Sequence, residues 1–266
     1  MISYNGDILD EKELTIPFLN RAFLYGDGFF ESIFIHSDKM PLWHLHAERI
    51  KNAAEILQFQ NINILKVLES IENLTEVTKG SFKRARISFF RENGGLYTPT
   101  SRNAEFVIEI KPIAKDIKAL PTDGITLGIS SYQKAVQPFG SFKSLNSQLY
   151  VLAGIEKQKL GFDELILFNH YHAITECISS NIFWFENEEL FTPSLKTGCV
   201  NGVMRKHVLE VCKKQGIKVY EVETDLPHSV SEMFLTNAIQ GIVPVKSINN
   251  EELRQSQTRY LHQLVW

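Results

Sequence analysis

Two stretches decide the fold assignment: Phe142-Lys143-Ser144-Leu145-Asn146 and, further along the chain, Thr175-Glu176-Cys177-Ile178-Ser179-Ser180. The first segment places one amine among small and apolar neighbours, and the second places one carboxylate at the head of a hydroxyl-rich turn. A lysine that is partly removed from water can be held neutral and can form a Schiff base with a carbonyl group. The two segments therefore predict a site for a carbonyl cofactor.

Each member of this pair also has a plainer interpretation. A lysine beside apolar residues is commonly a surface residue whose stem packs on them while its amine stays in water. Glu176 is equally compatible with an exposed turn carboxylate, and Ser179 and Ser180 with ordinary turn residues.

Composition indicates a globular protein with a substantial core. The chain has 266 residues, of which 44% are hydrophobic and 22% charged, which is enough for one large domain or two of ordinary size. The net charge of -3, from 28 basic and 31 acidic residues, provides no positive field for nucleic acid. We expect no nucleic-acid partner.

The N-terminal residues Met1-Ile2-Ser3-Tyr4-Asn5-Gly6-Asp7 lack the cationic and apolar segments of a signal peptide. No apolar stretch approaches the ~18 residues of a membrane span. The three cysteines, Cys177, Cys199 and Cys212, have no paired close spacing that would suggest disulfides or a zinc site. These features predict a cytoplasmic protein without a membrane segment, in which the cysteines are reduced packing residues.

Strands and helices are predicted from the period of the apolar residues. The predicted strands are 2–4, 29–35, 85–90, 104–110, 125–130, 164–168 and 181–185. The predicted helices are 45–57, 62–74, 149–160 and 203–215. Residues 111–124 carry two prolines, several lysines and a terminal Asp-Gly, as a connection does. We therefore predict domains at 1–112 and 125–266, joined by 113–124.

An anion site is predicted where Asn201-Gly202-Val203-Met204 opens a helix, because the first backbone N–H groups of a helix attract a phosphate. The alternative is an ordinary capped helix without a ligand. Arg49 lies on a predicted helix, from which a guanidinium can hold an anion with two hydrogen bonds. The alternative for Arg49 is an exposed charge that pairs with Glu48 or Glu55.

Two further motifs resemble ligand sites but are incomplete. Gly26-Asp27-Gly28 begins like a dinucleotide-binding loop, but Glu31 stands where the third glycine belongs. His44 and His46 alternate as two ligands on one strand face would, as do His170 and His172, yet no carboxylate or thiolate completes a ligand set. We predict no dinucleotide site and no metal.

With these motifs in this order, the chain resembles the fold-type IV pyridoxal-phosphate enzymes, the class IV aminotransferase family. That family includes branched-chain and D-amino-acid aminotransferases and aminodeoxychorismate lyases. The resemblance extends from residues 20–28 to residues 236–245. It implies an α/β (α+β) protein of two mixed α/β domains, of the D-amino-acid aminotransferase-like type. It also implies pyridoxal 5'-phosphate in the interdomain cleft, a small-molecule amine as substrate, and a homodimer whose partner helps to line the substrate pocket.

The resemblance also implies roles for single residues. Lys143 looks like the Schiff-base lysine, Glu176 like the partner that keeps the pyridine nitrogen protonated, and Arg49 like a phosphate ligand. A protonated pyridine matters because it is the electron sink of this cofactor. The other implied cofactor-binding residues are Ser179, Ser180, Val200, Val203, Met204, Thr236, Asn237 and Ala238.

Four positions favour the lyases over the aminotransferases within this family. Ser32 is a hydroxyl residue at a place where the aminotransferases usually lack one, and Cys177, Asn201-Gly202 and Asn237-Ala238 are also more lyase-like. We therefore predict a 4-amino-4-deoxychorismate lyase that makes 4-aminobenzoate and pyruvate for folate biosynthesis, with Lys143 and Ser32 as catalytic residues. The alternatives are a transaminase for D-amino or branched-chain amino acids, and a non-catalytic pyridoxal-phosphate-binding protein.

The loop Arg91-Glu92-Asn93-Gly94-Gly95-Leu96-Tyr97-Thr98-Pro99 departs from the lyase pattern. Glu92 and Leu96 replace a small and a basic residue, which weakens the expected pocket for an acidic substrate. A salt bridge from Arg91 to Glu92 or Glu105 is the alternative to a substrate contact. The residues predicted to contact substrate are Tyr25, Arg91 and Tyr97.

Overall fold

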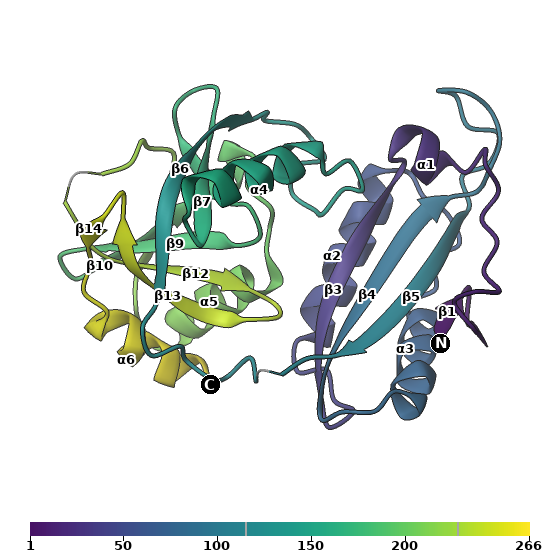
Figure 1. The fold of residues 1–266 in the computed structure, drawn as a ribbon, viewed down its shortest axis with the longest axis horizontal. Coiled ribbons are helices and arrows are strands. Elements are labelled where there is room, and N and C mark those ends of the chain that lie inside the picture. Colours follow the sequence, from purple (N-terminus) through teal and green to yellow (C-terminus); the bar gives the residue numbers. More distant parts are fainter. Residues whose placement is uncertain (115, 228) are drawn as a thin grey trace. The chain divides into compact units, whose positions relative to one another are not determined.

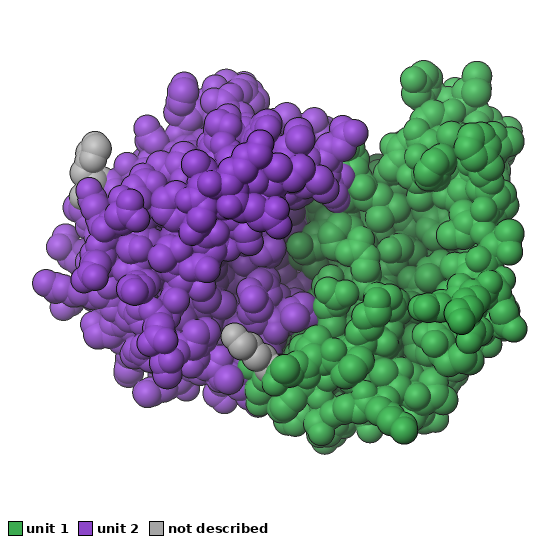
Figure 2. All heavy atoms as spheres, in the orientation of Figure 1, with its two compact units in different colours: residues 1–116, 142–146 green, residues 117–141, 147–266 purple. Residues whose placement is uncertain are grey.

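The computed structural model describes residues 1–114, 116–227 and 229–266 and divides them into two units. Unit 1 comprises Met1–Asp116 and Phe142–Asn146, and unit 2 comprises Ile117–Ser141 and Ser147–Trp266. Figure 2 colours the two units separately. The division after Asp116 falls inside the predicted connection. The grouping of the short segment Phe142–Asn146 with unit 1 was not anticipated from the sequence.

Unit 1 is built on an antiparallel sheet with the strand order β2-β1-β5-β4-β3. The strands are β1 (Ile2–Tyr4), β2 (Asp7–Leu9), β3 (Gly28–His36), β4 (Phe82–Arg91) and β5 (Ala104–Pro112). Helices α2 (Trp43–Ile56) and α3 (Ile64–Val77) lie along one face of this sheet (Figure 1). A short helix, α1 (Arg21–Tyr25), precedes β3.

The two faces of β3 have different surroundings because side chains alternate along a strand. Phe29, Ile33 and Ile35 join the core under α2 and α3, where they meet residues such as Ile50 and Ile71. The other face of β3 carries alternate residues that are only partly buried, among them Phe30 and Ser32.

The segment Phe142–Asn146 reaches β3 through backbone hydrogen bonds. The Phe30 N–H donates to the Lys143 carbonyl at 2.8 Å, and the Leu145 N–H donates to the Gly28 carbonyl at 3.0 Å. A side chain at Gly28 would place Cβ 2.2 Å from the Phe89 carbonyl and 2.6 Å from Leu145. Glycine is thus required at position 28, where β3 is packed between β4 and the segment Phe142–Asn146. The backbone hydrogen bonds to β3 place Lys143 in unit 1.

Unit 2 contains a mixed sheet with the main strand order β11-β10-β9-β12-β13-β6-β7-β8, and β14 also pairs with β13. The pairs β6–β7, β6–β13 and β10–β11 are parallel, and the others are antiparallel. The strands are β6 (Ile125–Lys134), β7 (Glu164–Asn169), β8 (Ile174–Cys177), β9 (Asn181–Glu186), β10 (Glu189–Pro193), β11 (Val219–Val222), β12 (Val230–Asn237), β13 (Gly241–Ile248) and β14 (Glu251–Glu252).

Helices connect and cover these strands. Helix α4 (Gln148–Leu160) joins the parallel strands β6 and β7, and the 3₁₀ turn η1 (Leu195–Thr197) and α5 (Val203–Lys214) join β10 to β11. The C-terminal helix α6 (Ser256–Val265) packs against α5, β12 and β13. Strands β9 and β12 are almost continuously buried because both of their faces are covered, with Trp184 in one core and Phe183 stacked on Phe234 on the opposite face.

The predicted mixed α/β fold is confirmed, and each predicted strand and helix overlaps one in the structure. The elements that were not predicted are the strands β2, β8, β10, β11, β12, β13 and β14 and the helices α1 and α6. In strands β8, β10, β11, β12 and β13 the apolar residues are either continuous or interrupted by residues such as Thr, Glu and Pro, so the period-2 signal is weak. Among the described residues, no helix is both long enough and apolar enough to cross a membrane.

Candidate functional site

Glu176 is a buried carboxylate in β8 that accepts three hydrogen bonds. It is 3% exposed. Its Oε1 accepts from the Lys134 ammonium and, at 2.6 Å, from the Tyr150 hydroxyl, while its Oε2 accepts from the Val200 N–H at 2.7 Å. The alternative of an exposed turn carboxylate is therefore wrong. Four separate segments of unit 2 converge on one charge.

Sequence reasoning missed Lys134 and Tyr150. Lys134 ends β6 and lies opposite Asn169 in the sheet, and Tyr150 lies in the first turn of α4. Burial and then the Glu176 charge raise the pKa of Tyr150, so its phenol remains a neutral donor. The one available signal was Lys134 itself, a polar residue at the end of an alternating strand. Such residues are too common to identify a site.

The cysteines near this carboxylate are neutral thiols. Burial and then Glu176 raise the pKa of Cys199 to about 11. Burial raises the pKa of Cys177 well above its usual range, with Glu164 and Glu176 adding to the effect. Cys177, Cys199 and Cys212 are all buried and free, as expected for packing residues.

The start of α5 forms a second feature of unit 2. Its N-cap is Gly202, and no side chain caps the helix there. The Val203 and Met204 side chains are buried in the core. A Cβ at Gly202 would lie 1.9 Å from Asn181 Oδ1, and Asn181 Nδ2 donates to the Val200 carbonyl at 2.7 Å. The backbone N–H groups of this first turn thus stand in a tight, Cβ-intolerant bend, which suits an anion.

Thr236 adjoins this bend. It is opposite Asn181 in the β9–β12 pairing and is 1% exposed. Within residues 1–114, 116–227 and 229–266, its buried Oγ1 has no hydrogen-bond partner. An unsatisfied buried hydroxyl costs about 1–3 kcal/mol. Thr236 therefore marks a place where a ligand oxygen would complete the hydrogen bonding.

The turn after β12 is organised by Asn237. Its Oδ1 accepts from the N–H groups of Ile239 and Gln240, and its Nδ2 donates to Ser180 Oγ at 3.0 Å. Ala238 lies inside this turn. The structure thus brings Ser180, Asn237 and Ala238 next to Thr236, as a shared site requires.

Ser179 differs from its neighbour Ser180. Its hydroxyl donates to Glu164 at 2.7 Å, and its N–H donates to the same carboxylate oxygen at 3.3 Å. Burial raises the pKa of Glu164 against the lowering effect of these hydrogen bonds. Because its hydroxyl donates to Glu164 at the start of β7, we leave Ser179 out of the site that we propose below.

In unit 1, Arg49 is held by a buried carboxylate of β3. Arg49 Nε and Nη2 each donate to Glu31 at 2.7 Å, and His46 Nδ1 lies 2.7 Å from Glu31 Oε2. Arg49 is 6% exposed, so the alternative of an exposed helix charge paired with Glu48 or Glu55 is wrong. Sequence reasoning missed the partner, because β3 and α2 meet only in the folded core.

The charges of this cluster are set by burial and pairing together. Burial raises the pKa of Glu31, but Arg49 and His46 outweigh it and bring the pKa to about 2. Burial lowers the pKa of His46 against the raising effect of Glu31. The cluster is therefore an ionised carboxylate held between a guanidinium and an imidazole, and it fixes the orientation of Arg49.

Phe30 and Ser32 share one face of β3, and the Lys143 side chain approaches the Phe30 ring. The Lys143 ammonium is 5.5 Å from the Phe30 ring centroid, and the Arg86 guanidinium carbon is 3.9 Å from it on β4. Arg86 is also the register partner of Ser32. Arg86, which sequence reasoning missed, thus adds a cation beside the two predicted catalytic residues.

The predicted substrate residue Arg91 has a structural role instead. It is 6% exposed and donates to Asp27 at 2.9 Å and 3.2 Å and to the Leu57 carbonyl at 2.8 Å. Its salt-bridge partner is Asp27, and neither Glu92 nor Glu105 takes that place. Its Nε and Nη2 donors are thus occupied inside unit 1, so we do not propose it as a substrate ligand.

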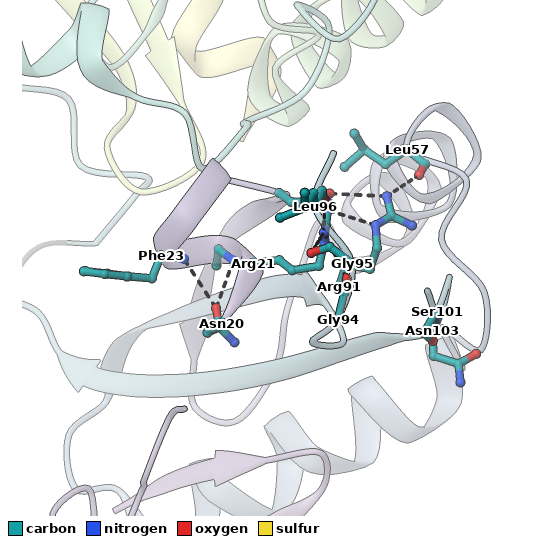
Figure 3. A network of polar contacts seen from close by, with 12 residues as sticks. Asn20, Arg21, Phe23, Leu57, Arg91, Gly94, Gly95, Leu96, Ser101 and Asn103 are labelled. Atoms are coloured by element: carbon teal, nitrogen blue, oxygen red, sulfur yellow. Dashed lines mark hydrogen bonds and ion pairs between the residues drawn. The ribbon is translucent and has the colours of Figure 1, made fainter. Parts of the chain in front are cut away.

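Arg21 holds the loop that follows Arg91. It donates to Asp27 at 2.8 Å. It also donates to the Gly94 and Leu96 carbonyls at 3.1 Å and 2.6 Å (Figure 3). The loop places Tyr97 against Tyr25, with ring centroids 5.5 Å apart, and leaves Tyr97 89% exposed. The two predicted substrate tyrosines are therefore neighbours.

Comparison with known proteins identifies the family. The model of the class IV amino-transferases matches residues 28–248. The aminodeoxychorismate lyase of Bacillus subtilis strain 168 is 29% identical over 260 residues, which cover 93% of this chain and 86% of the lyase. The D-alanine aminotransferase of Bacillus licheniformis is 24% identical over 262 residues, or 95% and 89% of the two chains.

A solved structure shares the fold. The branched-chain amino acid aminotransferase from Thermobaculum terrenum in its PLP form superposes with a TM-score of 0.86 at 19% identity, covering 99% of this chain and 92% of that one. The relatives thus include both lyases and transaminases. Because the family model matches most of the sequence, the chain belongs to the class IV aminotransferase family.

Proposed function

We propose that this chain binds pyridoxal 5'-phosphate and converts 4-amino-4-deoxychorismate into 4-aminobenzoate and pyruvate. The observation that carries the reaction is that Arg86 and Lys143 both lie over the Phe30 ring, while Ser32 is opposite Arg86 in the pairing of β3 with β4. A hydroxyl and a cation beside the reactive amine suit a substrate that carries carboxylates and loses a proton and an oxygen-linked group. The similarity to the Bacillus subtilis lyase supports the same choice.

The residues of unit 2 fit the proposed cofactor. The start of α5 and the Thr236 hydroxyl suit a phosphate, because no side chain caps this helix and the hydroxyl has no partner among the described residues. The bend at Gly202 leaves no room for a Cβ beside these donors. Glu176 would hold the ring nitrogen, and Val200 lies against Glu176 through its N–H. In unit 1, the family resemblance makes Arg49 a further phosphate ligand. When bound, the cofactor supplies the electron sink for the reaction.

The protein residues divide the chemistry between them. Lys143 would hold the cofactor through its carbonyl group, and as a free amine it would take the proton from the substrate ring carbon that bears nitrogen. The bond from the ring to the enolpyruvyl oxygen breaks, and Ser32 relays a proton to the departing group, which ends as pyruvate. Arg86 pairs with a substrate carboxylate. Aromatisation of the ring to 4-aminobenzoate drives the step.

The second candidate is a transaminase for D-amino or branched-chain amino acids, since the relatives include both kinds of enzyme. The same lysine and cofactor residues serve that reaction, so they do not separate the two. A non-catalytic pyridoxal-phosphate-binding protein is a candidate of another class. For either enzyme we propose a homodimer.

The test is a direct comparison of both reactions. Purified protein loaded with pyridoxal phosphate is assayed for 4-aminobenzoate from 4-amino-4-deoxychorismate, and for keto acids from a panel of amino acids with 2-oxoglutarate. We expect 4-aminobenzoate to predominate. Keto-acid formation without 4-aminobenzoate would instead establish the transaminase, and a bound cofactor with neither product would establish the non-catalytic protein.

Ser32→Ala tests the proposed proton relay. Because a positioned acid or base typically contributes 10²–10⁴-fold, we expect kcat for the lyase to fall by about 100-fold while cofactor affinity is unchanged. Ser88→Ala is a matched control, since Ser88 lies two residues after Arg86 on the same face of β4. Equal kcat values for the two variants would remove Ser32 from the mechanism.

A further inference from the structure

Lys134 is the least expected member of the Glu176 cluster. It is 6% exposed, and among the described residues Glu176 is the carboxylate within ion-pair distance of its ammonium. The pairing of β6 with β7 is irregular between Ile129 and Gln133, and after this irregularity Lys134 lies opposite Asn169. A local irregularity of this kind can redirect a side chain. It brings a lysine of β6 to the buried carboxylate of β8, although β7 lies between these two strands in the sheet.

Stability alone does not account for this pair. Removing an ammonium and a carboxylate from water costs several kcal/mol each, and well-packed apolar residues often serve equally well. The Lys134 ammonium is also 5.5 Å from the Tyr150 ring centroid, and the Tyr150 hydroxyl donates to the same carboxylate oxygen. Both side chains therefore act on the charge of Glu176.

The hydrogen bonds of Glu176 leave room for one more donor. A carboxylate has about four lone-pair positions on its two oxygens. Lys134 and Tyr150 use Oε1, and the Val200 N–H uses one position on Oε2. The remaining position is on Oε2, the oxygen that Lys134 does not contact.

We propose that Lys134 is a positioning residue whose contact with Glu176 favours a proton on the cofactor ring nitrogen over a proton on this carboxylate. The inference rests on the proposed function, because it requires pyridoxal phosphate to bind with its ring nitrogen at Glu176. In a buried site, a neutral carboxylic acid beside a neutral pyridine competes with the ion pair, since burial penalises charge. An ammonium in contact with Oε1 would favour the ion pair, if the ring nitrogen took the remaining position on Oε2.

Two neutral variants separate charge from folding. Lys134→Met removes the charge and the donor, whereas Lys134→Gln removes the charge and retains an N–H donor for Glu176. Lys134→Arg restores a cation, and Lys213→Met is a control at an exposed lysine of the same unit. Circular dichroism establishes which variants fold, and Lys134→Gln provides the test if Lys134→Met does not.

The primary readout is the nitrogen-15 NMR signal of protein loaded with ring-labelled pyridoxal phosphate. We expect a protonated ring nitrogen in the wild type, Lys134→Arg and Lys213→Met. In Lys134→Gln we expect the ratio of protonated to unprotonated nitrogen to fall at least about tenfold, which is one unit in the pKa of that nitrogen. A wild-type signal in Lys134→Gln would overturn the inference.

A cofactor analogue with carbon in place of the ring nitrogen provides a second readout. Lys134→Gln should lower kcat with the natural cofactor and have no effect with the analogue, because the charge then has no nitrogen to act on. An equal loss with both cofactors would show a merely structural role. If the wild type does not bind pyridoxal phosphate and shows no absorbance near 400 nm, the proposed function itself is rejected. If the wild type binds the cofactor but Lys134→Gln has an unchanged nitrogen signal, only the role of Lys134 is rejected.

Discussion

Glu31→Gln tests whether the buried cluster of Glu31, Arg49 and His46 is a pH-dependent support of unit 1. The pKa of Glu31 is lowered from 4.5 to about 2, against the raising effect of burial. A shift of about 2.5 units corresponds to about 3 kcal/mol of folding free energy at neutral pH. The side chain is 1% exposed, so solvent screens this contribution little.

The sign of the pH dependence follows from the depressed pKa. The contribution is fully present above the unfolded-state pKa of 4.5 and is lost as pH falls through the folded-state value of about 2. It should amount to about 3 kcal/mol at pH 7 and roughly 1.5 kcal/mol at pH 3, and vanish below pH 2. Glu31→Gln also leaves the Arg49 guanidinium buried without its carboxylate, a change that costs about 3–5 kcal/mol when a buried pair is broken.

The assay is hydrogen exchange followed by mass spectrometry on peptides from β3 and α2, because it reports the opening of unit 1 alone. Glu55→Gln, an exposed substitution on α2, is the control and should change the opening free energy by less than about 0.5 kcal/mol. The difference between wild type and Glu31→Gln should be about 3 kcal/mol or more at pH 7 and shrink steadily below pH 5. A difference under about 0.5 kcal/mol at pH 7, or one that does not depend on pH, would refute the reasoning.

Two further predictions concern the anion site of unit 2. Gly202→Ala places Cβ 1.9 Å from Asn181 Oδ1 and should weaken pyridoxal-phosphate binding by at least about tenfold in a fluorescence titration, since the bend before α5 must open; unchanged affinity would separate this bend from the phosphate. Thr236→Val removes a buried hydroxyl that has no partner among the described residues, so we expect thermal stability without cofactor to stay equal or rise by about 1 kcal/mol while cofactor affinity falls. A loss of stability without any loss of affinity would show that the Thr236 hydroxyl serves the fold and not a ligand.

Much of the fold was predictable from local patterns. Strands β3, β4 and β5 show alternation, and helices α2 and α3 show three-to-four spacing, because each of these elements buries one face. Strands β12 and β13 of unit 2 escaped prediction, because alternation disappears when both sides of a sheet are covered, whereas the equally buried β7 and β9 were recognised from their continuous apolar runs. Glu232 shows a related limit, since its carboxylate caps α6 from within β12, a contact that no local pattern reveals.

The sequence by itself determined the order of the chemical groups, namely an amine at Lys143, a carboxylate at Glu176 and a helix start at Gly202. These signals are local, because residue type and spacing along the chain are enough to define them. Tertiary structure alone decided that Lys134 and Tyr150 contact Glu176, that Glu31 holds Arg49, and that Arg91 is used by Asp27. The physical reason is that strand register and burial select the partner of each charge from segments far away in the chain, and a buried charge takes its role from that partner.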